Sequence, residues 1–276
     1  MSMNDKKKTR VGILGCGAIG SRMALSIKTD LKTKAVVSAV FDIQRERAEK
    51  LAKNFSRGRI IKNSFEELLS SCDLVVEAIN AQDTQKLIRQ ALLAKKDVLV
   101  MSVGKLLGAH DIFKIASRNH CRLLVPSGAV AGLDAVKAAS QRKISKITLT
   151  TRKPVFGFSQ NDYFIKKKID LSKLTSETVL FDGNVKDAVK HFPQNINVAA
   201  AIALASLAGD KLRIRIITSP EYKLNSHEIE VVGEFGRLMT RTENEICPDN
   251  PKTSYLAVLS AIQTLKQYFE EVKIGT

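Results

Sequence analysis

Residues Thr9–Gly20 read TRVGILGCGAIG, and this stretch decides the fold of the first half of the chain. An apolar run leads into Gly15, Gly17 and Gly20 at the spacing GxGxxG, and apolar residues then recur at helical spacing. The order is strand, tight turn, helix. Gly15 permits the sharp turn, Gly17 keeps side chains away from an approaching pyrophosphate, and Gly20 lets strand and helix pack closely. The stretch therefore predicts a dinucleotide whose pyrophosphate lies at the N-terminus of the helix.

A short glycine motif also occurs in ordinary turns, so its context has to support this interpretation. A second apolar run, Ala35–Phe41, ends in Asp42, at the position where a dinucleotide-binding unit carries the carboxylate that binds the ribose hydroxyls. Asp42 favours NAD because it repels a 2'-phosphate, whereas Arg45 and Arg47 just beyond it would accommodate NADP. The residues expected to contact the cofactor in this half are Gly15, Gly17, Ala18, Ile19, Gly20 and Asp42.

Strand and helix patterns continue to alternate up to about residue 135. Further elements are expected, in order, at 73–78 (strand), 84–94 (helix), 98–101 (strand), 111–117 (helix) and 122–125 (strand). Strands apolar enough for burial on both faces, alternating with helices, indicate a parallel sheet. We therefore predict an α/β fold, a Rossmann-type doubly wound parallel sheet, over residues 1–135.

The pattern changes past about residue 140, where short strands carry polar residues at every second position. Strands are expected at 147–152, 178–181, 212–216, 227–234 and 237–242, and helices at 185–190 and 198–207. Such alternation is typical of strands with one solvated face. Residues 136–249 are therefore predicted to form an α+β domain with a mostly antiparallel sheet. The lysine-rich segment 159–176 is expected to be an exposed loop or a lid.

The last residues return to a helical pattern. Asn250 is suited to the N-cap of a helix and Pro251 to its first position. The apolar residues that follow, between Tyr255 and Phe269, would form one stripe, and the first sheet is the expected packing partner. Residues 250–276 are therefore predicted to be a helix that completes the first domain and makes it discontinuous.

Composition argues against several classes of protein. Hydrophobic residues make up 44% of the chain and charged residues 26%, as in ordinary globular proteins. The apolar runs are shorter than the roughly 18 residues of a membrane span. The N-terminus has no secretory signal, so we expect a cytoplasmic protein that does not bind membranes. The four cysteines lie far apart without a CxxC pair, which predicts neither disulfides nor a metal site.

The net charge of +16 raises the question of nucleic-acid binding. The basic residues are spread along the chain in short clusters, without interleaved aromatic residues, and aromatic residues total only 5%. Because the sequence has no stacking platform for bases, we expect a solvated basic surface and no nucleic-acid partner. The same positive field would favour the binding of anionic metabolites.

Two clusters are candidates for contact with the nicotinamide. The glycine-rich loop at 126–134 gives backbone groups close access to a flat ring, although Gly132 and Asp134 also fit simple capping of the next helix. Asn197 stands before an alanine-rich helix. Its amide suits a carboxamide, and an ordinary N-cap explains it equally well.

A third cluster, at 225–229, contains His227. This side chain shares strand parity with Ile229 and Val231, so it is expected to point into a core or into the floor of a site. A lone histidine on an apolar face is more often structural than catalytic. The other three histidines lie in polar helical settings, which leaves His227 as the general acid/base candidate.

Several long sequence blocks resemble those of L-aspartate dehydrogenases over nearly the whole chain. They are GxGxIG at 15–20, PSGAVAGLDA at 126–135, LTTRKP at 149–154, FPQNINVAA at 192–200, NSHEI at 225–229, VxGEFG at 231–236 and NPKTSYLAVLS at 250–260. The resemblance implies that Ala129 and Asn197 contact the dinucleotide and that His227 is the active-site residue. It also implies a homodimer formed through the second domain.

The resemblance further implies the oxidation of L-aspartate to iminoaspartate with NAD or NADP, followed by hydrolysis to oxaloacetate and ammonia, or the reverse amination. His227 would activate the water that attacks the imine, and iminoaspartate would serve NAD biosynthesis. The two carboxylates of the substrate need cationic partners, and Lys105 and Lys252 lie in suitable loops.

Two other interpretations stay open on the residues alone. One is another enzyme with the same architecture, such as a homoserine dehydrogenase, a dihydrodipicolinate reductase or a sugar dehydrogenase. The other is a non-catalytic dinucleotide sensor or a basic nucleic-acid-binding protein, which predicts salt-sensitive nucleic-acid binding without turnover.

Overall fold

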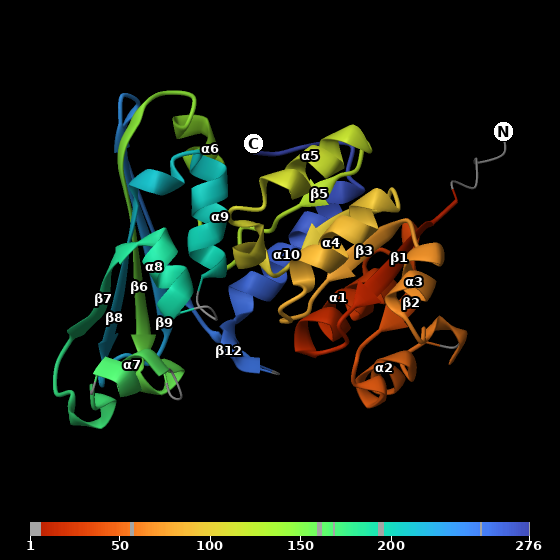
Figure 1. Ribbon diagram of the computed structural model, residues 1–276, viewed down its shortest axis with the longest axis horizontal. Helices are drawn as coiled ribbons and strands as arrows, with labels where there is room; N and C mark the ends of the chain where they lie inside the picture. Colours follow the sequence, from red (N-terminus) through yellow and green to blue (C-terminus); the bar gives the residue numbers. More distant parts are fainter. Residues whose placement is uncertain are drawn as a thin grey trace. The chain divides into compact units, whose positions relative to one another are not determined.

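The computed structural model describes residues 7–55, 58–158, 162–167, 169–192, 196–248 and 250–275 (Figure 1). Internal contacts divide the chain into two compact units. Unit 1 comprises Met1–Pro126 and Ala261–Glu271, and unit 2 comprises Ser127–Ser260 and Val272–Thr276. Among the described residues, no helix has the length and apolar character needed to span a membrane.

Unit 1 is built on a five-stranded parallel sheet with the strand order β2-β1-β3-β4-β5. The strands are β1 (Thr9–Leu14), β2 (Ala35–Phe41), β3 (Leu74–Glu77), β4 (Asp97–Val100) and β5 (Leu123–Leu124). The helices are α1 (Ala18–Thr29), α2 (Arg45–Ala52), α3 (Phe65–Ser70), α4 (Thr84–Leu93), α5 (His110–Arg118) and the second half of α10 (Tyr255–Tyr268). The strand order reverses at β1, so the predicted doubly wound parallel sheet is confirmed.

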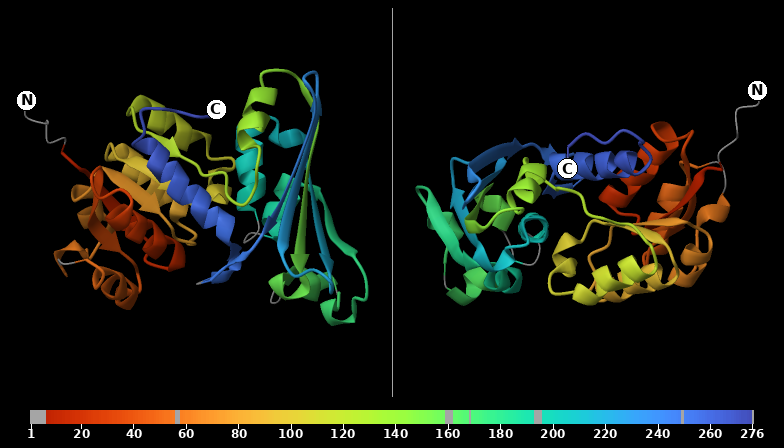
Figure 2. Two further views of the ribbon diagram at one scale, coloured as in Figure 1. Left: turned by 180° about the vertical axis from the view of Figure 1, so that it is seen from behind. Right: turned by 90° about the horizontal axis from the view of Figure 1, so that it is seen from above.

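Helices cover both faces of the unit 1 sheet (Figure 2). On one face, Ile13 of β1 belongs to a buried apolar cluster with Met23 of α1 and Leu265 of α10. On the other face, a side chain at Gly12 would meet Leu68 of α3 at 2.8 Å. Burial on both faces explains why these strands read as continuous apolar runs in the sequence.

Unit 2 contains a five-stranded sheet with the order β10-β9-β6-β8-β7. The strands are β6 (Ile144–Pro154), β7 (Thr178–Asn184), β8 (Leu212–Ser219), β9 (Asn225–Gly233) and β10 (Gly236–Asn244). Strands β6 and β8 pair in parallel and the other neighbours pair antiparallel, so the sheet is mostly antiparallel, as predicted. The helices α6 (Leu133–Ala139), α8 (Val185–His191) and α9 (Asn197–Ser206) lie along the same side of this sheet (Figures 1 and 2).

The side of the sheet that faces the helices is apolar at one end and polar at the other. Leu149, Ile214 and Ile229 form part of the buried core. Thr151 follows Leu149 by two residues on β6, and His227 precedes Ile229 by two residues on β9. Both therefore lie on the same side of the sheet, and both are buried. Because polar side chains need partners when they are buried, this polar end is the candidate site of unit 2.

The C-terminal helix begins later than the sequence predicted. Residues Asn250–Ser254 form strand β12, which pairs antiparallel with β11 (Ile246–Cys247), and α10 starts only at Tyr255. The side chain of Asn250 donates to the Thr253 hydroxyl instead of capping a helix. A proline is tolerated here because both strands of a two-stranded sheet are edge strands. The prediction of a helix from residue 250 is therefore wrong.

The segment 159–176, which was predicted to be an exposed loop or lid, contains ordered structure where it is described. Helix α7 (Asp162–Lys167) carries Phe164, which is buried and packs edge-on against Phe158 with ring centroids 5.8 Å apart. Residues 159–161 and 168 lie outside the described part. The buried phenylalanine anchors this part of the segment in the apolar interior of unit 2.

Candidate active site

The glycine turn in unit 1 has the geometry that a bound pyrophosphate requires. Gly15 has a φ of +96°, and a side chain there would meet the Ala78 carbonyl oxygen at 2.6 Å. A side chain at Gly20 would lie 1.9 Å from the Gly15 oxygen, so the backbone itself excludes one. At Gly17, the N-cap of α1, a side chain would meet nothing within 4 Å. Gly17 thus leaves the N-terminus of α1 open to an anion.

The Asp42 carboxylate lies beside this turn. One of its oxygens accepts a hydrogen bond from the Cys16 backbone nitrogen at 2.8 Å, and the other accepts from the Gln44 nitrogen at 2.9 Å. Each oxygen keeps a second lone pair for a ribose hydroxyl. Burial, and then the charge of Asp42, raise the pKa of the Cys16 thiol to about 12, so Cys16 stays protonated. The glycine turn and Asp42 therefore lie together, and this arrangement could hold a dinucleotide.

Unit 1 also contains a buried carboxyl group that the sequence interpretation missed. Glu77, the last residue of β3, is fully buried and accepts hydrogen bonds from the Ser102 nitrogen at 3.0 Å, the Ser102 hydroxyl at 2.8 Å and the Ile79 nitrogen at 2.9 Å. Burial is the main cause that raises the pKa of Glu77. The side chain joins the loops that follow β3 and β4, at the carboxyl edge of the parallel sheet.

In unit 2, the glycine-rich loop that begins at Ser127 is fixed to strand β10. The Ala129 carbonyl accepts hydrogen bonds from the Thr242 hydroxyl at 2.8 Å and the Asn244 amide at 3.1 Å. The Ala131 carbonyl accepts from the Thr240 hydroxyl at 3.0 Å. A side chain at Gly132, whose φ is +79°, would meet a side-chain carbon of Thr240 at 2.7 Å, so the loop follows β10 closely and the backbone there favours glycine.

His227 lies in β9, between Thr151 of β6 and Thr242 of β10 in the register of the sheet. Only 6% of its surface is exposed, and its Nδ1 lies 3.0 Å from the Thr151 hydroxyl oxygen. Burial, with a contribution from the positive charge of Lys153, lowers the pKa of His227 to about 3. The imidazole is therefore neutral, and Thr151 holds one of its two nitrogens.

Thr242 links the predicted active-site histidine to the predicted nicotinamide loop. It is the cross-strand neighbour of His227 and donates its hydroxyl hydrogen to Ala129. A side chain at Gly128 would meet Val198, the neighbour of Asn197, at 3.8 Å. Unit 2 thus gathers Ala129, Asn197 and His227 in one region, although they lie far apart in the sequence.

The position of Asn197 decides one of the open alternatives. Asn197 is the first residue of α9 and is exposed, while Ile196 occupies the N-cap position, which has no side-chain hydrogen bond. The N-cap alternative is therefore wrong for Asn197. Residues 193–195, which belong to the same predicted cluster, lie outside the described part of the chain.

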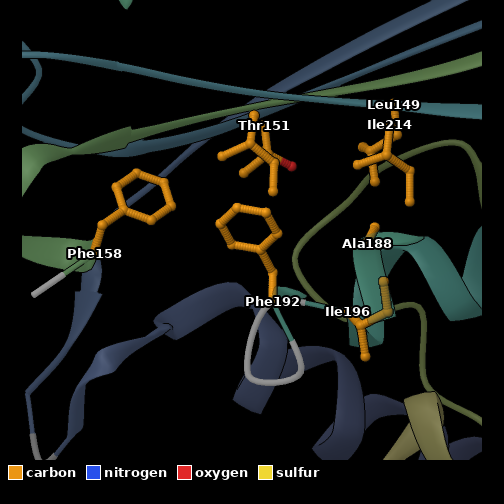
Figure 3. Close-up of a pocket in the computed structure, with 8 residues that line it drawn as sticks. Leu149, Thr151, Phe158, Ala188, Phe192, Ile196 and Ile214 are labelled. Carbon is orange, nitrogen blue, oxygen red and sulfur yellow. The ribbon is translucent and has the colours of Figure 1, made fainter. Parts of the chain in front are cut away.

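A small cavity lies next to Thr151 inside unit 2 (Figure 3). Thr151 and Leu149 project from the sheet toward Phe192 and Ala188, and Phe158 closes one side. The cavity measures about 10 Å³, which is room for one water molecule at most. It is too small for an amino-acid substrate, so it belongs to the packing behind Thr151.

Lys153 is a second residue that the sequence interpretation did not single out. It follows Thr151 by two positions on β6, only 9% of its surface is exposed, and burial lowers its pKa to about 8. Of the lysines that were singled out, Lys105 lies in a 3-10 turn of unit 1, and the side chain of Lys252 lies outside the described part. Lys153 is a buried charged residue on the strand that pairs with the strand of His227.

Comparison with known proteins agrees with this division of the chain. Residues 15–126 match the family described as homoserine dehydrogenase, NAD binding domain, and residues 134–268 match aspartate dehydrogenase, C-terminal. An L-aspartate dehydrogenase of Methanosarcina mazei is 43% identical over 270 residues, which are 97% of this chain and 99% of the relative. That of Methanosarcina barkeri is 42% identical with the same coverage. The chain belongs to the L-aspartate dehydrogenase family.

A solved structure has the same fold. The aspartate dehydrogenase of Thermotoga maritima superposes with a TM-score of 0.72 at 22% identity and covers 98% of this chain and 100% of its own. The resemblance predicted from the sequence blocks is thus confirmed, and the chain is a family member with an NAD-binding domain. Within the family, the glycine turn and Asp42 lie in the NAD-binding match, and Asn197 and His227 lie in the C-terminal match.

Proposed function

We propose that this protein catalyses the NAD-dependent oxidative deamination of L-aspartate to oxaloacetate and ammonia, through iminoaspartate. The observation that carries the proposal is the contact chain from His227 through Thr242 to Ala129, because it joins a buried base to a loop suited to the nicotinamide. Relatives that are 43% and 42% identical over nearly the full chain carry the name L-aspartate dehydrogenase, which supports this substrate.

The residues of unit 1 would bind the adenosine half of the cofactor. The open N-terminus of α1 at Gly17 accepts the pyrophosphate, with backbone contacts from Gly15 to Gly20. Asp42 binds the ribose hydroxyls and disfavours a 2'-phosphate, so we propose NAD as the preferred cofactor. The bound nicotinamide supplies the chemistry of hydride acceptance.

The residues of unit 2 would hold the reacting groups. Ala129 and Asn197 position the nicotinamide. His227 acts as the general base that removes a proton from the water attacking the imine carbon. For this, Nδ1 carries the hydrogen and donates it to Thr151, which leaves the lone pair of Nε2 for the proton.

The low pKa of His227 fits this role only when substrate is bound. In the unliganded site the imidazole is desolvated and lies near a cation, so a proton is disfavoured. An aspartate substrate brings two carboxylates, and negative charge within about 4–6 Å raises the pKa of a histidine. With aspartate bound, the higher pKa lets His227 accept a proton from the attacking water.

We further propose that the protein works in the cytoplasm as a homodimer on small molecules, without nucleic acid, and that its iminoaspartate feeds NAD biosynthesis. The side of the unit 2 sheet opposite His227 supports the dimer. Ser226 Oγ is buried there without a hydrogen-bond partner among the described residues. Met239 of β10 is 56% exposed. Light scattering on the purified protein tests this surface as a dimer interface.

Turnover of the purified protein tests the main proposal. L-Aspartate with NAD or NADP should yield reduced cofactor, and oxaloacetate with ammonia should consume it, while homoserine and a sugar serve as control substrates. Absence of turnover with aspartate in both directions refutes the proposal. His227→Gln should bind NAD normally and lose turnover, and full activity of this variant would refute the role of His227.

A further inference from the structure

The backbone pairing of β3 ends at Glu77, where the chain leaves the sheet of unit 1 and enters a loop. Ala78 donates its backbone hydrogen to the Leu14 oxygen at 2.8 Å, and Met101 donates to the Glu77 backbone oxygen at 3.0 Å. Beyond these bonds, the backbone N–H groups of the loops after β3 and β4 need other acceptors. The side chain of Glu77 provides them.

Glu77 holds the two loops with both oxygens of its carboxyl group. One oxygen accepts from the Ile79 nitrogen at 2.9 Å and the Ser102 hydroxyl at 2.8 Å, and the other accepts from the Ser102 nitrogen at 3.0 Å. The Ser102 hydroxyl also reaches the Ile79 carbonyl oxygen. Burial of a carboxyl group costs free energy, so a side chain that only filled this space would be better apolar. The carboxyl group instead ties the loop after β3 to the loop after β4.

The loop after β3 also lies against the glycine turn. A side chain at Gly15 would meet the Ala78 oxygen at 2.6 Å and the Ile79 Cγ2 at 2.8 Å. The loops that Glu77 holds therefore begin beside the candidate pyrophosphate site. They continue along the carboxyl edge of the sheet toward β4, the parallel neighbour of β3.

The strand order indicates which half of a dinucleotide reaches these loops. Asp42 follows β2 and the glycine turn follows β1, while β3 and β4 lie on the other side of β1. A dinucleotide with its adenosine ribose at Asp42 and its pyrophosphate at the turn has its second nucleotide over the ends of β3 and β4. These are the strand ends that Glu77 joins.

We propose that Glu77 is a positioning residue for NAD, because it holds Ile79 and Ser102 in the place where unit 1 receives the nicotinamide nucleotide. This inference rests on the binding of NAD in the proposed function. A purely structural Glu77 would instead stabilise unit 1 as a whole, and its loss would weaken the binding of both halves of the cofactor equally.

Glu77→Gln tests the proposal, because glutamine has the same shape but places an NH₂ donor against a backbone N–H. Ser102→Ala is a second variant, which removes the hydroxyl and keeps the backbone nitrogen. The control is Val98→Ala, a fully buried residue near the start of β4. Calorimetric titration measures Kd for NAD and Kd for ADP, which lacks the nicotinamide nucleotide. The midpoint of thermal unfolding is recorded as well.

We expect Glu77→Gln to raise Kd for NAD by about tenfold or more, the effect of one lost charge-assisted hydrogen bond. Kd for ADP should stay within about a factor of two, because the Ala78 backbone keeps its bond to Leu14. Ser102→Ala should show a smaller loss in the same direction. Val98→Ala should lower the unfolding temperature and change both dissociation constants by the same factor.

The results also separate the two proposals. An equal change of both dissociation constants in Glu77→Gln, or no change in either, overturns the role of Glu77. If Glu77→Gln does not fold, the same comparison in Ser102→Ala decides. Absence of aspartate turnover in the unmodified protein overturns the proposed function. A selective loss of NAD affinity in Glu77→Gln still supports the role of Glu77 in that case, because it is measured without substrate.

Discussion

Replacement of Thr151 by valine tests how the fold sets the protonation of His227. The Thr151 hydroxyl lies 3.0 Å from His227 Nδ1, and both side chains are buried. Valine has nearly the same shape and no hydroxyl, so the change leaves the imidazole nitrogen without this partner. Loss of the partner of a buried polar group costs about 1–3 kcal/mol. We expect the free energy of unfolding to fall by about this amount.

The same substitution should affect catalysis more than binding. Without Thr151, the hydrogen is no longer held on Nδ1, and the Nε2 lone pair is available for only a fraction of the time. An energetic loss of about 1.4–3 kcal/mol at the transition state corresponds to a kcat about 10- to 100-fold lower. Kd for NAD should stay within a factor of two, because the glycine turn and Asp42 belong to unit 1.

Thr148→Val provides the matched control on the same strand. Thr148 is as buried as Thr151, but its hydroxyl has no hydrogen-bond partner among the described residues. Removal of an unpartnered buried hydroxyl should leave stability unchanged or raise it by about 0.5–1 kcal/mol. The assays are urea unfolding and steady-state kinetics on both variants. A Thr151→Val protein with unmodified kcat, or an equal loss of kcat in Thr148→Val, refutes the reasoning.

Three further predictions concern other parts of the molecule. Gly20→Ala should destabilise unit 1 and abolish NAD binding, since the new carbon would lie 1.9 Å from the Gly15 oxygen. Calorimetric titration with NAD measures the affinity, and an affinity equal to that of the unmodified protein contradicts this prediction. Asp42→Ser should lower the ratio of kcat/KM with NAD to kcat/KM with NADP by at least about tenfold, because one charge-assisted contact is lost. An unchanged ratio contradicts the role of Asp42 as the ribose ligand. The pKa of His227 falls from 6.5 unfolded to about 3 folded, so between these values the unfolded chain binds more protons and stability falls as pH is lowered. Between pH 6.5 and pH 4.5 this effect lowers the free energy of unfolding by about 2–3 kcal/mol. His227→Gln lacks the titrating group, so its free energy of unfolding, measured in urea, should fall by about 2–3 kcal/mol less over the same pH range.

The elements set by local sequence were predictable. The turn from Gly15 to Gly20 follows from residues within one strand, one turn and one helix, and its conformational demands are visible in the glycines themselves. The orientation of His227 followed from strand parity, because alternate residues of a strand share a face. In both cases the information lies within a few residues.

Features that depend on distant partners were missed or wrongly predicted. Residues Asn250–Ser254 carry a good helix-start signal, but their backbone pairs with Ile246–Cys247, which local propensity does not reveal. Lys153 follows an arginine and precedes a proline, and its burial arises only when β6 pairs with β8 and β9. Glu77 offered a weak signal, a single acidic residue at the end of an apolar strand, but its partner Ser102 comes from another loop.

In the proposed reaction the protein oxidises L-aspartate at its α-carbon, and the NAD that the glycine turn and Asp42 would hold would accept the hydride. The most direct measurement uses L-aspartate deuterated at this carbon, with NAD and the unmodified protein, and records the mass of the reduced cofactor together with the keto acid formed. We predict reduced NAD that carries one deuterium and an equal amount of oxaloacetate. Reduced NAD without deuterium, or the absence of any reduced NAD, would refute the proposed reaction.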